Sequence, residues 1–319
     1  MDTRWGRREL YEQPSISGEG EGHLLTDHYE NSMEWVVHRD GPVATVKFEA
    51  VRKPLADFLE HHISAALALE EVRFDDSVRV IVITGRDDGT LFELGPERGD
   101  TTPWHTKVLN PATRPGGVGA LKGPWSLTQG IERTFAALAL MEKPVVGRLN
   151  GDAYGFALHM MWGCDIVVAR EDVILGDSHL AMHPVMPAAM AAGDGAFAFL
   201  PLFMTPVRLK EFLLLGRTLT GAQAAEFGMV NCAVSADDLD AKVDEYVKAF
   251  LARPPVPVMR TKRAIHKRFV EQMNLALDYS WMAESIDHWE GAALDFEQQY
   301  TLRHDEPAWS PYSNGEAKA

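Results

Sequence analysis

The spacing of apolar residues in the first half of the chain predicts strands and helices in turn. Two apolar runs within residues 35–49 flank Asp40-Gly41, and this pair is typical of a hairpin turn because Gly tolerates positive φ. Residues 54–71 carry apolar side chains at helical spacing, which predicts an amphipathic helix. The β-branched runs at residues 78–84 and 145–149 predict buried strands.

The second half of the chain continues the same alternation and then becomes helical. Its pattern predicts a helix over 155–162, a strand over 165–169 and a short strand over 173–175. Strands that alternate with helices imply an α/β layered core. Further helices are expected over residues 206–215, 221–227, 236–251, 256–269 and 275–300.

The changes in pattern divide the chain into four segments. Residues 1–32 lack periodicity and are expected to form an extended or flexible arm. A core follows over 33–235, then a helical lobe over 236–303 and a polar tail over 304–319. Within the core, the Gly- and Pro-rich stretch 95–124 is too long for a simple connection, and such loops tend to be functional.

Charge and composition narrow the possible partners. The 319 residues include 31 basic and 46 acidic side chains, for a net charge of -15. A surface this acidic repels phosphate backbones and anionic lipids, so neither nucleic acid nor a membrane is expected as a partner. Cys164 and Cys232 stand apart in apolar sequence, as reduced core thiols do. We find no apolar leader or span and expect a cytoplasmic protein.

Several motifs in a fixed order resemble the crotonase (enoyl-CoA hydratase/isomerase) superfamily. Residues 143–157 read KPVVGRLNGDAYGFA and residues 164–169 read CDIVVA. Weaker matches lie at 78–95, 215–231 and 287–291. The resemblance implies an α/β fold, with a core spiral of ββα units and a C-terminal helical trimerisation lobe. It also implies a homotrimer or homohexamer that acts on a small carbonyl substrate.

In that family two backbone N–H groups stabilise an oxyanion, and this chain departs from the pattern at both positions. The first donor would follow Gly95, where Pro96 has no N–H to give. The second falls on Phe156 in place of a glycine. The places of the two catalytic glutamates of a hydratase fall on His159 and near His179. These departures argue against ordinary enoyl-CoA hydration.

One branch of the superfamily, the β-diketone hydrolases of the 6-oxocamphor hydrolase type, uses a His-Asp pair without CoA. Asp177-Ser178-His179 and Gly193-Asp194-Gly195 resemble that branch's histidine loop and its aspartate. The resemblance implies that His179 deprotonates water while Asp194 steadies the imidazolium. His183 competes with His179 for the role of base because the intervening loop is long.

Other residues are weaker candidates for the pocket. His159 lies three positions after Phe156 and either donates to the oxyanion or is a satisfied core histidine. Trp104 and His105 either replace the lost donor or cap an apolar pocket, and Glu93 is either an acid-base group or a solvated one. We expect no metal, because Pro184 argues against a helix that presents both nearby histidines.

Three functions remain open. The first is a crotonase-fold hydrolase that cleaves a carbon-carbon bond in a β-diketone or related ketone without a cofactor. The alternative is an enoyl-CoA hydratase, isomerase or other acyl-CoA enzyme, for which a CoA thioester is the substrate. The second alternative is a catalytically inactive crotonase-fold binding subunit, which the loss of a donor at Pro96 favours.

Overall fold

The computed structural model describes residues 35–49, 58–87, 89, 130–177, 179 and 191–291. Contacts divide the chain into two units, Met1–Ser32 and Met33–Ala319. All described residues belong to the second unit. The predicted arm, tail and long loop therefore lie outside the described residues, and the predicted domain boundaries stay predictions.

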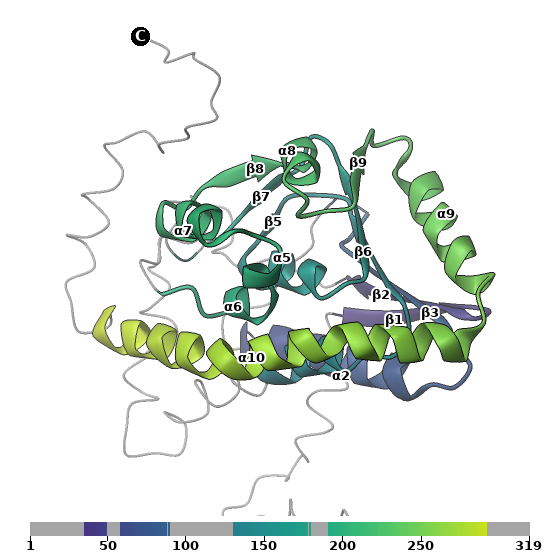
Figure 1. Cartoon of the computed structure of the whole chain (residues 1–319), viewed down its shortest axis with the longest axis horizontal. Helices are drawn as coiled ribbons and strands as arrows, with labels where there is room; N and C mark the ends of the chain where they lie inside the picture. Colours follow the sequence, from purple (N-terminus) through teal and green to yellow (C-terminus); the bar gives the residue numbers. More distant parts are fainter. Residues whose placement is uncertain are drawn as a thin grey trace, which may run out of the picture. The chain divides into compact units, whose positions relative to one another are not determined.

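The larger of two sheets has six strands in the order β1-β2-β3-β4-β6-β9 (Figure 1). β1 and β2 form the predicted antiparallel hairpin, which turns at Gly41 with φ 54°. All other pairs in this sheet are parallel. The strands are β1 (Trp35–Asp40), β2 (Val43–Phe48), β3 (Val80–Thr84), β4 (Val145–Leu149), β6 (Ile166–Arg170) and β9 (Cys232–Val234).

A smaller sheet contains β5 (Ala153–Tyr154), β7 (Ile174–Gly176) and β8 (Thr218–Thr220) in that order. The chain enters it from the large sheet twice, passing from β4 to β5 and from β6 to β7. Helix α5 (Gly155–Trp162) follows β5 directly. This alternation of strands and helices confirms the α/β class, while β8 and β9 are three-residue strands that the sequence pattern did not predict.

The two faces of the large sheet bury different helices. On one face, Val80, Val146 and Val168 pack with apolar residues of α9 (Leu239–Leu251). The other face belongs to the main core, which includes residues of α2 (Phe58–Phe74), of the helical stretch 130–139 and of α5. Both faces are covered, as expected for the nearly continuous apolar runs in the parallel strands. Helix α7 (Pro206–Leu214) precedes β8, and α8 (Gly221–Glu226) connects β8 to β9.

A single long helix, α10 (Pro255–Gly291), replaces the two helices predicted over 256–269 and 275–300. No Gly or Pro interrupts residues 270–274, so nothing in that stretch ends the helix. α10 packs against α6 (Ala196–Phe199) and the 3₁₀ turn at Leu200–Leu202. The structure describes one chain, so the trimerisation predicted for this lobe stays a prediction.

A buried ion network attaches α10 to the large sheet. Lys262 Nζ lies 2.6 Å from Asp165 Oδ2 and donates to Lys143 O at 2.6 Å. His266 Nε2 lies 3.3 Å from the other oxygen of Asp165. Burial opposes ionisation of Asp165, but the charge of Lys262 and the hydrogen bonds to the carboxylate together outweigh it and lower the pKa of this carboxyl. Within the described ranges, no helix is both long and apolar enough to span a bilayer.

Candidate active site: a buried cluster of histidines and carboxylates

Five segments of the chain bring histidine and carboxylate side chains into one buried cluster. α2 and α5 each supply a histidine, the chain after β7 supplies two residues, and the turn before α6 and helix α10 each supply a carboxylate. Buried ionisable groups are expensive unless they are paired, so their convergence is informative. The cluster consists of His62, His159, Asp177, His179, Asp194 and Glu284, each at most 6% exposed.

Asp177 lies between two histidine rings. His179 Nδ1 is 3.2 Å from each oxygen of the Asp177 carboxylate, and His159 Nε2 is 3.2 Å from Oδ2. The backbone N–H of His179 also donates to Asp177 Oδ1 at 3.0 Å. The two rings are nearly parallel, with centroids 6.4 Å apart. A carboxylate at Nδ1 places a proton there and directs the other nitrogen of His179 away from it.

That other nitrogen, Nε2 of His179, faces two further carboxylates. It lies 3.4 Å from Asp194 Oδ2 and 3.6 Å from Glu284 Oε1. His62 Nε2 approaches the opposite oxygen of Asp194 at 3.8 Å. Among the described residues, Nε2 of His179 makes no hydrogen bond. The arrangement therefore leaves a polar position between His179, Asp194 and Glu284 where a water or substrate oxygen can bind.

His159 is held at both ends. Its Nδ1 donates to the backbone carbonyl of Asp194 at 2.7 Å, while its Nε2 faces Asp177. The ring of Trp162 stacks on it with centroids 5.4 Å apart and an interplanar angle of 24°. The histidine at the expected position on α5 thus belongs to the cluster and fixes the turn that carries Asp194.

Two glycines allow this turn to approach the cluster. Gly195 has a φ of 85°, in the region that favours glycine, and directly precedes α6. A Cβ at Gly195 would overlap the ring of Phe135, and a Cβ at Gly193 would overlap the Glu284 carboxylate. The Gly-Asp-Gly sequence is therefore required by close packing on both sides of Asp194.

The mutual charges of the cluster shift its pKa values in opposite directions. Burial alone would lower the pKa of His179, but the charge of Asp177 and the nearby carboxylates of Asp194 and Glu284 raise it well above its ordinary value. Burial opposes ionisation of Asp177, yet His179 lowers its pKa. Burial also opposes ionisation of Asp194, but His179, with smaller effects of His62 and His159, lowers its pKa to about 2. The neighbouring carboxylates therefore favour the protonated form of His179.

Phe156 forms part of the wall of the site. It is fully buried, and its ring meets that of His62 edge to face with centroids 4.3 Å apart. The preceding Gly155 has φ 50° and begins α5. The backbone N–H of Phe156 thus lies in the first turn of a helix, where N–H groups point out of the helix end and favour negative charge.

The structure brings together three of the four predicted catalytic residues, His179, Asp194 and His159. The geometry differs from the prediction in the partner of His179. The carboxylate at Nδ1 is that of Asp177, whereas Asp194 faces Nε2. The predicted His183 and the pocket candidates Gly95, Pro96, Trp104, His105 and Glu93 lie outside the described residues.

Two members of the cluster, His62 and Glu284, were not predicted from the sequence. His62 sits in the predicted helix 54–71 one position before Ile63, among the residues that spacing assigns to the core. A histidine on the apolar face of a helix is the only signal it leaves. Glu284 lies in a helix rich in charged residues, and nothing local separates it from a solvated glutamate.

The cluster also determines where a metal could bind. Within the described residues, ligand atoms of His179, Asp194 and Glu284 lie within 4.8 Å of one another. A histidine whose other nitrogen contacts a carboxylate is a common arrangement around bound metals. The arrangement is equally that of an acid-base histidine, so the expectation that the protein works without a metal stays a prediction.

The fold and the cluster together define a class: an α/β protein whose strands alternate between two sheets around a buried cluster of histidines and carboxylates. Residues 125–287 match the family model described as enoyl-CoA hydratase/isomerase. The chain belongs to this family, which lies within the crotonase superfamily.

Relatives and solved structures agree on the fold and differ in their chemistry. A 4-chlorobenzoyl coenzyme A dehalogenase from Arthrobacter sp. is 30% identical over 223 residues, covering 69% of this chain and 72% of the dehalogenase. An enoyl-CoA hydratase/isomerase from Mycobacterium paratuberculosis aligns with a TM-score of 0.66 and 25% identity, covering 85% of this chain and 98% of that one. A β-diketone hydrolase from the cyanobacterium Anabaena sp. aligns with a TM-score of 0.64 and 21% identity, covering 82% and 96%.

Proposed function

We propose that this protein hydrolyses a carbon-carbon bond in a β-diketone or a related ketone, with His179 as the base. The observation that carries the proposal is the position of His179, between Asp177 at Nδ1 and the carboxylates of Asp194 and Glu284 at Nε2. A histidine oriented at one nitrogen and open at the other is the arrangement that general-base activation of water requires.

The first chemical step is addition of water. Neutral His179 accepts a proton from water at Nε2 while Asp177 holds the ring and stabilises the imidazolium that forms. Asp194 and Glu284 flank the water because both face the same nitrogen. The hydroxide attacks one carbonyl carbon, and the alkoxide that results lies near the N–H of Phe156 in the first turn of α5.

The second step is cleavage. The alkoxide re-forms a carbonyl as the bond to the α-carbon breaks, and the bonding electrons pass into the enolate of the second ketone. The imidazolium of His179 then protonates the enolate carbon. One water is consumed. An acyclic diketone gives a carboxylic acid and a ketone, whereas a cyclic diketone gives a single open-chain keto acid.

An acyl-CoA enzyme is the alternative, and the relatives favour it. The dehalogenase and the mycobacterial enzyme are both named for CoA chemistry. The Anabaena hydrolase is 21% identical, which supports only the shared fold. Against the CoA alternative stand His159 and His179, because the family resemblance implies that the places of the hydratase glutamates fall on His159 and near His179. The proposal thus rests on side chains of this chain and not on a relative's activity.

The test compares substrates under single-turnover conditions. Wild-type protein is mixed in excess with cyclohexane-1,3-dione or with crotonyl-CoA, and the products are measured by mass spectrometry. We expect keto-acid formation from the diketone and no change in crotonyl-CoA. His179→Asn should reduce the rate by roughly 10²–10⁴-fold, because the general base is lost.

The matched control is His266→Asn, which removes another buried histidine that contacts Asp165 outside the cluster. It should keep the wild-type rate, and chelation with EDTA should leave the rate unchanged. Turnover of crotonyl-CoA alone would contradict the hydrolase and support the alternative. Inactivity on both substrates, with acyl-CoA binding retained, would support an inactive binding subunit.

A further inference from the structure

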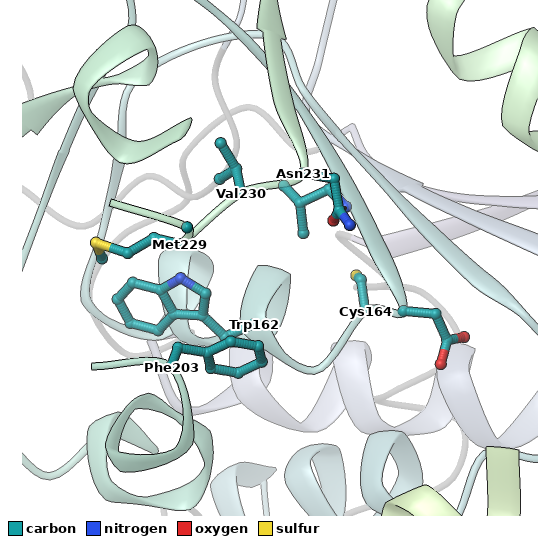
Figure 2. Close-up of a pocket in the computed structure, with 9 residues that line it drawn as sticks. Trp162, Cys164, Phe203, Met229, Val230 and Asn231 are labelled. Atoms are coloured by element: carbon teal, nitrogen blue, oxygen red, sulfur yellow. The ribbon is translucent and has the colours of Figure 1, made fainter. Parts of the chain in front are cut away.

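A small cavity lies beside the end of α5, where β6 meets the chain between α8 and β9 (Figure 2). Its volume is about 110 Å³. One wall is the indole of Trp162, the same ring that stacks on His159. None of the six cluster residues lines this cavity, so it is separate from the candidate active site.

Trp162 presents a hydrogen-bond donor that lacks an acceptor. Its side chain is 1% exposed, and Nε1 makes no hydrogen bond to any described residue. Figure 2 shows the indole nitrogen on the edge of the ring that faces Met229 and Val230, two other lining residues. A buried N–H without a partner is unfavourable, so an occupant with an acceptor atom would be favoured at this edge.

The ionisable groups that line the cavity leave no unpaired charge for an ion to balance. The Asp165 carboxylate is already engaged by Lys262 and by the backbone N–H of Val145. Burial raises the pKa of the Cys164 thiol, which keeps it neutral. Asn231 accepts from the N–H of Val167 at 2.7 Å through Oδ1, so its NH₂ group is the end left to donate. The wall thus combines apolar side chains with polar groups, and the donors that remain available on it are neutral.

We propose that this cavity is a binding site for a small neutral molecule with an apolar body and one acceptor oxygen, such as a ketone or an amide. A cavity of 150 Å³ accommodates benzene, so 110 Å³ suits a molecule of about five non-hydrogen atoms. The oxygen accepts from Trp162 Nε1, and the body contacts Phe203 and Val230. The proposal does not depend on the reaction catalysed at His179.

The test observes the indole directly. Protein with ¹⁵N-labelled tryptophan is titrated with cyclobutanone, and the eight indole N–H signals are followed by NMR. Trp162→Phe identifies the Trp162 signal by its loss. We expect that signal alone to shift saturably with cyclobutanone. Methylenecyclobutane has the same shape without the acceptor oxygen, and it should bind about five- to tenfold more weakly.

A second variant tests the space instead of the donor. Val230→Met adds volume inside the cavity and keeps the Trp162 N–H, so the saturable shift should disappear while the other indole signals keep their positions. A shift that is linear in ketone concentration, equal affinity for the two probes, or saturation retained in Val230→Met would each overturn the proposal. Because the readout is binding at Trp162, loss of the hydrolase proposal would leave this result unaffected.

Discussion

At the scale of single residues, the account depends on which nitrogen of His179 carries a proton. Asp177 contacts Nδ1, and two carboxylates face Nε2. Together these groups raise the pKa of His179 and favour its imidazolium form. A general base must first lose that proton. The residues that orient the base are therefore the same ones that move its working range to higher pH.

This argument predicts the pH dependence of diketone hydrolysis. Since the pKa of His179 is raised, kcat/KM should increase with pH along a limb whose apparent pKa lies above the ordinary value of about 6.5. Asp177→Asn removes the negative charge at Nδ1, so its limb should move to lower pH. The plateau should fall by roughly 10²–10⁴-fold, because the ring loses its orientation.

Asp172→Asn serves as the control for this profile, since Asp172 lies five positions away and pairs with Arg170 on the surface. It should leave both limb and plateau unchanged. An activity that decreases as pH rises through this region would mean that the protonated ring is the working form. His179 would then be a general acid, not the base.

At the scale of elements, the site depends on one tight turn. Gly193-Asp194-Gly195 connects the cluster to α6, and the two glycines allow Phe135 and Glu284 to pack against the backbone. The sequence predicted Asp194 because the Gly-Asp-Gly motif is local. It could not predict Glu284, which reaches the site only because α10 passes beneath α6 for its packing.

Gly195→Ala tests the turn. The new Cβ would meet both a φ of 85° and the ring of Phe135, so we expect a loss of about 3 kcal/mol or more in the free energy of unfolding. Gly228→Ala shares the positive φ, at 71°, but has no atom within 4 Å of the new Cβ. It should cost only about 1 kcal/mol. Equal urea midpoints for the two variants would contradict the packing argument.

The attachment of α10 gives a second prediction at this scale. Lys262→Met leaves the buried Asp165 carboxylate without its cation, which should cost about 3–5 kcal/mol. Adding Asp165→Asn to this variant should recover part of the loss, because the unpaired charge is removed. Lys242→Met, at an exposed ion pair with Glu245, is the control and should keep the wild-type urea midpoint. No recovery in the double variant would show that the network acts through shape and not charge.

The sequence predicted most of the order of strands and helices, but it predicted only some members of the histidine-carboxylate cluster. Strands such as residues 145–149 are marked by local β-branched runs, whereas β8 and β9 have three residues each and pair only in the assembled sheet. His179 and Asp194 lie in local motifs. His62 enters the cluster through contacts between elements far apart in the sequence, which spacing along the chain does not encode.

At the scale of the whole molecule, α10 presents an apolar row to solvent. Leu275 is 77% exposed and Tyr279 71%, and Met282 and Ile286 continue the row at spacings of three and four residues. The family resemblance implies a trimer or a hexamer. In such an oligomer, the exposed apolar row of α10 would be buried against another subunit.

We therefore expect a trimeric or hexameric mass by size-exclusion chromatography with light scattering. Leu275→Lys combined with Tyr279→Lys should shift the mass toward a monomer, because two charges would have to be buried. Phe74→Lys, at an equally exposed apolar position outside α10, should leave the mass unchanged. A wild-type protein that is monomeric at every concentration would contradict the expectation.

The central claim is hydrolytic cleavage of a carbon-carbon bond with His179 as base, and labelled water tests it most directly. Cyclohexane-1,3-dione is incubated with the protein in H₂¹⁸O, and the product is analysed by mass spectrometry. We predict 5-oxohexanoate with ¹⁸O in its carboxylate, formed by the wild type and the His266→Asn control and lost in His179→Asn. The same product formed at an undiminished rate by His179→Asn, or no ring opening by the wild type, would contradict the account.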